Sequence, residues 1–133
     1  MTTLASFVTS LGDLTVTGVT VKLDEPPRSL KTTDMPTQWV QVPVIERMPS
    51  TFAKQGQLWP TFRAQLVIAL EPVNQNTQAA NWSAVLAMMD YLHAALADST
   101  IAQGRIQYQI LQGIVTVAET NYWAVVAEVE GHG

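Results

Sequence analysis

The sequence predicts an α+β fold: a single mainly antiparallel or mixed β-sheet with two helices packed on it, in the order α-β-β-β-α-β-β. Two segments place apolar residues at helical spacing, and five others alternate or are rich in β-branched residues, as strands are. Turn-forming residues separate most of these segments, and a length of 133 residues suits one domain. No internal repeat divides the chain, so we expect one domain over residues 1–133.

The first element is a short helix with one buried face. Apolar residues recur at i, i+3, i+4 and i+7 from Leu4 to Leu11, which is the stripe of an amphipathic helix. Thr2 or Thr3 is placed to cap its start, and Gly12 is placed to end it.

Two strands follow this helix. Alternation from Val16 to Leu23 predicts the first strand, which the acidic and proline residues at 24–27 end. An extended polar connection over residues 24–37 leads to the second strand, Trp39–Ile45. Pro43 cannot donate a ladder hydrogen bond, so it indicates an edge position or a bulge.

A long loop, residues 46–60, separates this strand from the next. Loops of this length in a compact domain are usually functional or disordered, and exposed aromatic residues are good anchors at interfaces. We expect the loop to be poorly ordered alone and ordered in an assembly; the alternative is that it folds back and fills a satellite core. The candidate interaction residues are Arg47, Met48, Phe52, Lys54, Leu58 and Trp59.

The second half of the chain predicts a strand, a helix and a hairpin. Thr61–Leu70 is the clearest strand, with apolar side chains on every second residue. The main helix runs from Ala79 or Asn81 to Ala97. Strands at about 105–118, interrupted by Gly113, and 122–130 pair through a turn at residues 119–121. The predicted apolar side of the main helix comprises Trp82, Val85, Leu86, Met89, Leu92, His93 and Leu96.

The residue inventory holds little catalytic chemistry. The chain has no cysteine, no phosphate-binding glycine loop and no serine nucleophile elbow. His93 lies three residues after Asp90, but a packed, hydrogen-bonded structural histidine is the expected role, and His132 falls in a terminus expected to be mobile. Glu128 and Glu130 alternate on one strand face, as on a solvated surface. We therefore expect no enzyme activity, no cofactor and no metal.

Charge and hydropathy constrain the partners. The net charge is −4, with +1 on residues 1–66 and −5 on residues 67–133, so the two halves could meet head to tail in an assembly, or differ by chance. This balance opposes tight DNA binding. Without a signal peptide or an apolar run long enough to span a bilayer, we expect a cytosolic chain with no membrane partner.

Of the four tryptophans, those at 39, 82 and 123 are expected in the core.

Four stretches carry a resemblance to a known family. They are VKLDEPPRSLKTTDMPTQWVQVP (21–43), TFRAQLVIALEP (61–72), NWSAVLAMMDYLHAAL (81–96) and NYWAVVAEVEG (121–131). In this order, the sequence resembles the tail terminator, or tail completion, proteins of long-tailed bacteriophages. The resemblance spans nearly the whole chain and is one of pattern, with no diagnostic residue.

The resemblance implies a structural role in the virion. Such proteins form a hexameric ring on the last ring of the tail tube, stop its growth and present a surface to the head-tail connector protein. The implied partners are further copies of the chain, the tail tube protein and the connector, with DNA only passing through the lumen. The implied location is the phage neck, after assembly in the host cytoplasm. The alternatives are another neck or minor tail protein, a small ligand-binding domain or enzyme, and a monomeric regulatory module.

Overall fold

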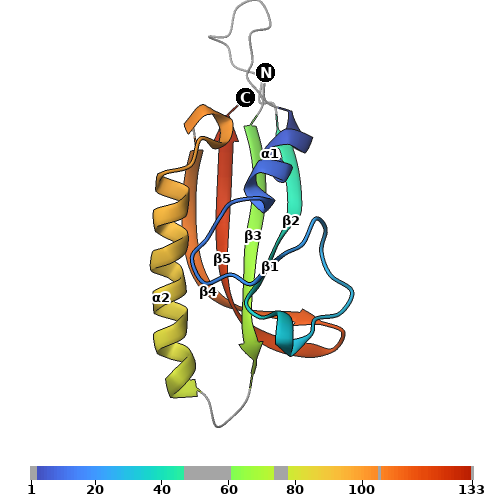
Figure 1. The fold of residues 1–133 in the computed structure, drawn as a ribbon. Helices are drawn as coiled ribbons and strands as arrows, with labels where there is room; N and C mark the ends of the chain where they lie inside the picture. Colours follow the sequence, from blue (N-terminus) through green and yellow to red (C-terminus); the bar gives the residue numbers. More distant parts are fainter. Residues whose placement is uncertain (1–2, 47–60, 74–77, 105, 133) are drawn as a thin grey trace, which may run out of the picture.

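The computed structural model describes residues 3–46, 61–73, 78–104 and 106–132. Five strands form one mixed sheet in the order β1-β2-β3-β5-β4, and two helices lie on the same face of it (Figure 1). The predicted fold class and element order are confirmed. The elements are α1 (Leu4–Gly12), β1 (Val21–Lys22), β2 (Thr37–Glu46), β3 (Thr61–Pro72), α2 (Gln78–Ala97), β4 (Ile106–Val117) and β5 (Thr120–His132).

Helix α1 forms as its apolar spacing predicts. Thr3 is its N-cap, and a capping box joins the side chains of Thr3 and Ser6 to each other's backbone N–H groups, which satisfies two of the unpaired donors at the start. Phe7 and Leu11 are buried, and the Phe7 ring stacks on Phe62 of β3 with centroids 5.8 Å apart. The helix is thereby fixed over the β2 and β3 side of the sheet.

The predicted strand from Val16 to Leu23 is too long. Only Val21–Lys22 forms β1, which pairs in parallel with the first two residues of β2. Before it the chain turns at Gly18, whose φ of 91° is in the region that glycine tolerates. Val16 is buried in the main core, so the apolar alternation here reflects a packed loop.

Strand β2 contains the bulge that Pro43 predicted. Its pairing with β3 shifts between Gln41 and Val44, and Val42 has a φ of 53°. Near its start, the buried Gln38 donates from Nε2 to the carbonyl oxygens of Gly12 and Leu14, at 2.8 and 2.9 Å. These bonds tie the C-terminal end of α1 to the sheet.

Strand β3 is the centre of the sheet and alternates as predicted. Its even-numbered side chains from Phe62 to Leu70 pack into the main core beneath the two helices. On the opposite face, Val67 and Ala69 pack with the buried Trp39 in a second, smaller core. The sheet is thus covered on one face by helices and on part of the other by the connection that follows β1.

The predicted apolar side of α2 is partly wrong. The residues that α2 buries are Val85, Met88, Leu92 and Leu96. Trp82 and Leu86 remain 55% and 45% exposed, and His93 is exposed as well. The alanines of this helix lie on several of its sides. The helix is therefore apolar on more than one side, and its sequence does not single out the buried side.

The closing hairpin has a tighter turn than predicted. Val117 pairs with Thr120, so Ala118 and Glu119 form a two-residue turn with φ values of 51° and 68°. The predicted interruption at Gly113 does not occur, since the β4–β5 register is unbroken. At His132, in the terminus expected to be mobile, the backbone pairs with Thr61 of β3.

The order of the strands has a consequence for the sheet edges. Strand β5, the last in the chain, inserts between β3 and β4 and is antiparallel to both. Strands β3 and β4 are therefore parallel to each other, and α2 connects them across β5. This places β4 at one edge of the sheet and β1 with β2 at the other.

Candidate functional site

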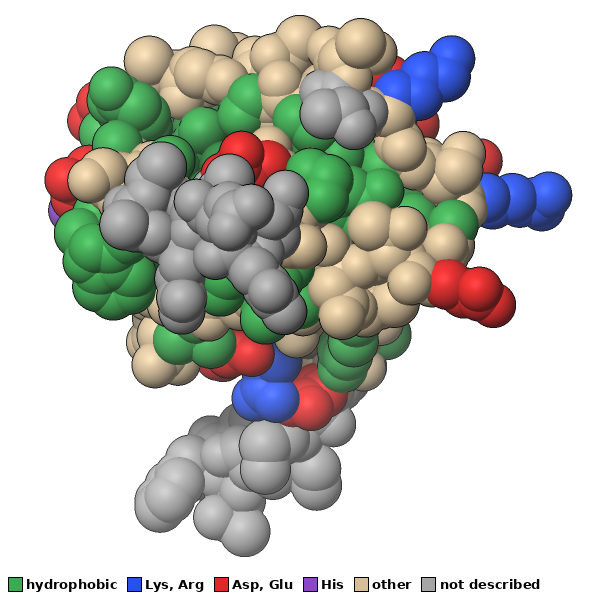
Figure 2. Space-filling model, turned by 90° about the horizontal axis from the view of Figure 1, so that it is seen from below, with side chains coloured by type: hydrophobic (Ala, Val, Ile, Leu, Met, Phe, Trp, Pro, Cys, Tyr) green, Lys and Arg blue, Asp and Glu red, His purple; other side chains and the backbone are tan. Residues whose placement is uncertain are grey.

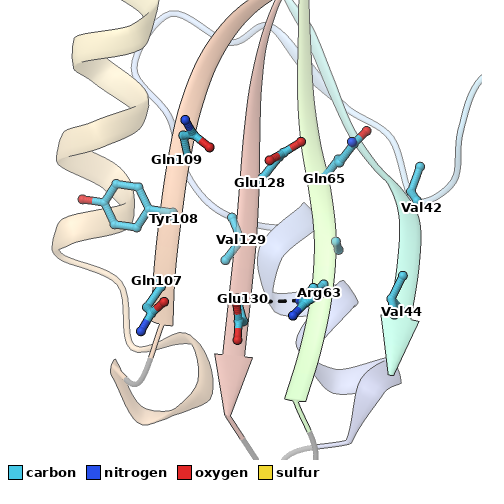
Figure 3. A pocket seen from close by; sticks show the side chains of 11 residues that line it. Val42, Val44, Arg63, Gln65, Gln107, Tyr108, Gln109, Glu128, Val129 and Glu130 are labelled. Carbon is cyan, nitrogen blue, oxygen red and sulfur yellow. Dashed lines mark ion pairs between the residues drawn. The ribbon is translucent and has the colours of Figure 1, made fainter. Parts of the chain in front are cut away.

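A shallow polar hollow lies on the sheet face opposite the helices. Its volume is about 490 Å³. Residues of β2, β3, β4 and β5 line it. Figure 3 shows Tyr108 directed toward α2 instead of onto this face. The polar side chains that line it are Arg63, Gln65, Gln107, Gln109, Glu128 and Glu130.

Ion pairs at one end of the hollow join three strands. Arg63 Nη1 lies 3.1 Å from Glu46 Oε1, and Arg63 Nε lies 3.7 Å from Glu130 Oε2. The three side chains are 49%, 36% and 31% exposed, so solvent screens both pairs. As predicted, Glu128 and Glu130 share one strand face, but Glu130 is half-buried and paired.

His93 lies outside this hollow. Its Nδ1 forms a 2.8 Å hydrogen bond with the Tyr108 hydroxyl on the helix side of β4. The predicted hydrogen bond of a structural histidine is confirmed, whereas its predicted burial is wrong. Among the described lining residues there is no histidine to act with Glu128 or Glu130, so the constellation that would favour an enzyme is not assembled there.

The described residues form neither a metal cluster nor a membrane-spanning helix. Within residues 3–46, 61–73, 78–104 and 106–132, no three side chains of His, Asp or Glu come together as a metal site. In the same part of the chain, no helix combines the length and hydropathy needed to cross a membrane.

The six predicted interaction residues of the long loop fall outside the described residues. Their role therefore stays a prediction. They are Arg47, Met48, Phe52, Lys54, Leu58 and Trp59. Of the tryptophans predicted in the core, Trp39 is buried, Trp123 is half-buried and Trp82 is exposed.

Strand β4 forms a long open edge. Among the described strands it has one hydrogen-bonded neighbour, β5, so its other side presents main-chain N–H and C=O groups. Its twelve residues include no charged residue and no proline, and no bulge breaks its register. Sheet edges are usually protected by one of these devices, and a flat edge without them is a template for another strand. Leu111 and Ile114 on it are 38% and 54% exposed.

Helix α2 adds an apolar flank to this edge. The His93–Tyr108 hydrogen bond shows which side of α2 faces β4. Trp82, Leu86 and His93 fall within a quarter turn of one another around the helix axis, so the exposed Trp82 and Leu86 lie on that same side. We call Leu111, Ile114, Trp82 and Leu86 together the β4 edge.

The other edge of the sheet, at β1 and β2, is a second and shorter open edge. Strand β1 pairs only with Thr37 and Gln38, so the outer side of β2 beyond them has no strand beside it among the described residues. Val42 and Ile45 there are 56% and 57% exposed, and we call these two residues the β2 edge. The two edges together hold six of the eight large hydrophobic side chains that are exposed in the described chain.

No protein-family model matches the sequence, and no curated protein is significantly similar to it.

Sequence reasoning missed the β4 edge. The only signal in the sequence is the run of twelve residues without a charge or a proline from Ile106 to Val117. Such a run is also what a central strand looks like. It becomes an edge only because β5 takes the place between β3 and β4.

Proposed function

We propose that the protein is a structural component of a phage, a tail terminator whose hexameric ring caps the tail tube. In this role it stops polymerisation of the tube and provides the surface to which the head joins. The observation that carries the proposal is the β4 edge: a long uncharged edge strand beside exposed apolar side chains suits a subunit that is completed by assembly. The resemblance of four stretches to the tail terminator family supplies the particular assembly.

The implied partners are other copies of the chain, the tail tube protein and the head-tail connector protein. DNA passes through the lumen of such a ring. The net charge of −4 agrees with this, because a surface that gripped the phosphate backbone would need clustered Lys and Arg. The place of action is the neck of the virion, with assembly in the host cytoplasm.

Two other functions are kept as alternatives. Another neck or minor tail protein would also use open edges for assembly. A small ligand-binding domain or an enzyme is favoured by a different observation, the polar hollow of about 490 Å³ lined by glutamines and carboxylates. Binding of a small molecule to the isolated protein, abolished by Glu128→Gln, would favour this alternative.

Native mass spectrometry and a tube-capping assay test the proposal. Six copies of the 14.6 kDa chain weigh about 88 kDa, and we expect this species to grow with concentration. Added to polymerising tail tubes, the protein should stop elongation and be found at one end of each tube. Tubes that elongate unchanged in its presence, with the protein unbound, would contradict the terminator function. Binding to connector-filled heads but not to tubes would favour a neck protein.

A further inference from the structure

We propose that the β4 edge of one copy is covered by the β2 edge of the next copy, so that subunits join head to tail through their sheets. The pairing of two unlike edges rests on the proposed ring, because a closed ring of one chain needs two different surfaces on each subunit. The two edges lie at opposite ends of one sheet, as such a contact requires.

The strand directions fit this contact. Strand β2 is antiparallel to β3, β3 to β5, and β5 to β4, so β2 and β4 of one chain run in opposite directions. Neighbours related by rotation about an axis along the strands keep these directions. The β4 strand of one copy then meets the β2 strand of the next in antiparallel orientation, which gives the more stable hydrogen-bonded pairing.

The exposed apolar side chains favour the unlike contact over a contact between two β4 edges. Joining β4 to β2 would place Val42 and Ile45, as well as Leu111 and Ile114 of the β4 strand, at the contact. Pairing two β4 edges would leave Val42 and Ile45 exposed on each copy. The two large exposed hydrophobic residues of the described chain that lie on neither edge are Val73 and Tyr91.

Strand β2 sets a limit on the length of the pairing. Pro43 has no N–H to donate, and the bulge between Gln41 and Val44 interrupts the ladder. We therefore expect a short main-chain pairing on one side of the bulge. Side-chain contacts between the edges supply the rest of the interface.

The strands and the helix of the two edges carry few charges. Strand β4 carries no charge, α2 carries only Asp90, and β2 carries only Glu46. The net charge of +1 on residues 1–66 depends on the loop residues Arg47 and Lys54. In the view along the sheet from the end where α2 begins, hydrophobic side chains gather on the α2 side, and Lys and Arg side chains protrude on the other side (Figure 2). The apolar edges are therefore the basis of the proposed contact.

Cysteine cross-linking tests the contact on a chain that has no native cysteine. Four single-cysteine variants are made. Ile45→Cys and Val42→Cys lie on the β2 edge, and Leu111→Cys and Ile114→Cys lie on the β4 edge. Mixed at high concentration under mild oxidation, at least one of the four pairs should give a disulfide-linked dimer. A double variant of that pair should give a ladder of larger species. Tyr91→Cys, mixed with either β2 variant, is the collision control and should stay unlinked.

Three results would overturn the proposal. A β4 variant that cross-links to itself while all mixed pairs fail indicates a symmetric β4 contact. Failure of all four pairs in samples that contain oligomers places the interface elsewhere. Absence of any oligomer at the highest soluble concentration also contradicts it. In a second measurement, Leu111→Lys should weaken self-association about tenfold or more, and Tyr91→Lys less than about twofold.

These outcomes are separable from those of the proposed function. Subunits linked through the two edges that do not cap tubes would support the contact and reject the terminator. Capping of tubes by a protein whose edges do not cross-link would do the reverse.

Discussion

The buried side of α2 can be tested by one substitution and a matched control. Leu92 and Leu86 are the same residue type, six positions apart on the same helix, but Leu92 is fully buried and Leu86 is 45% exposed. Changing either to Ala removes the same atoms and alters helix propensity equally. The difference in stability between the two variants therefore isolates the packing.

The expected magnitudes follow from burial. Leu92 packs in the main core, so Leu92→Ala should lower the free energy of unfolding by about 3 kcal/mol, within the usual 2–5 kcal/mol for such cavities. Leu86→Ala should cost about 1 kcal/mol or less, because water already reaches much of that side chain. For a domain of this length, about 3 kcal/mol lowers Tm by about 10 °C.

Urea unfolding followed by tryptophan fluorescence measures both variants. The experiment should be run at low protein concentration, where self-association contributes little to stability. We expect the midpoint to fall strongly for Leu92→Ala and slightly for Leu86→Ala, with the dependence on urea unchanged. Equal losses in the two variants, or a larger loss for Leu86→Ala, would refute the assignment of the buried face.

Three further substitutions have smaller expected effects. Arg63→Ala should cost about 1 kcal/mol or less in urea unfolding, since solvent screens its partly exposed ion pairs with Glu46 and Glu130; a loss above about 3 kcal/mol would contradict this. Glu119→Gly should raise the free energy of unfolding by about 1 kcal/mol, because glycine adopts the φ of 68° without strain; a lower Tm would argue against the turn. His93→Ala should lower the free energy of unfolding by about 1 kcal/mol in urea unfolding, because it removes the hydrogen bond to Tyr108. In a chain that already carries Tyr108→Phe, adding His93→Ala should leave the free energy of unfolding unchanged; a further loss of about 1 kcal/mol there would contradict the role of this bond.

Local signals were sufficient for much of the fold. The capping residue Thr3 and the spacing from Leu4 to Leu11 define α1, because both act within one or two helical turns. The alternation along Thr61–Pro72 defines β3, and Pro43 marks the bulge, because each reflects the hydrogen-bonding capacity or burial of a single strand. Such features depend on neighbours in the sequence, so they were sufficient to predict the fold class and the element order.

The positions of the open edges and exposed faces depend on contacts between distant segments of the chain. Nothing within β4 or β5 specifies that β5 inserts beside β3, yet this insertion makes β4 an edge. Likewise, Trp82 and Leu92 have the same apolar character, and only packing against the sheet buries one and exposes the other. The six predicted loop residues stay a prediction, and the β4 edge was not foreseen. Edges and exposed faces depend on which distant segments meet, and this information is spread over the whole chain.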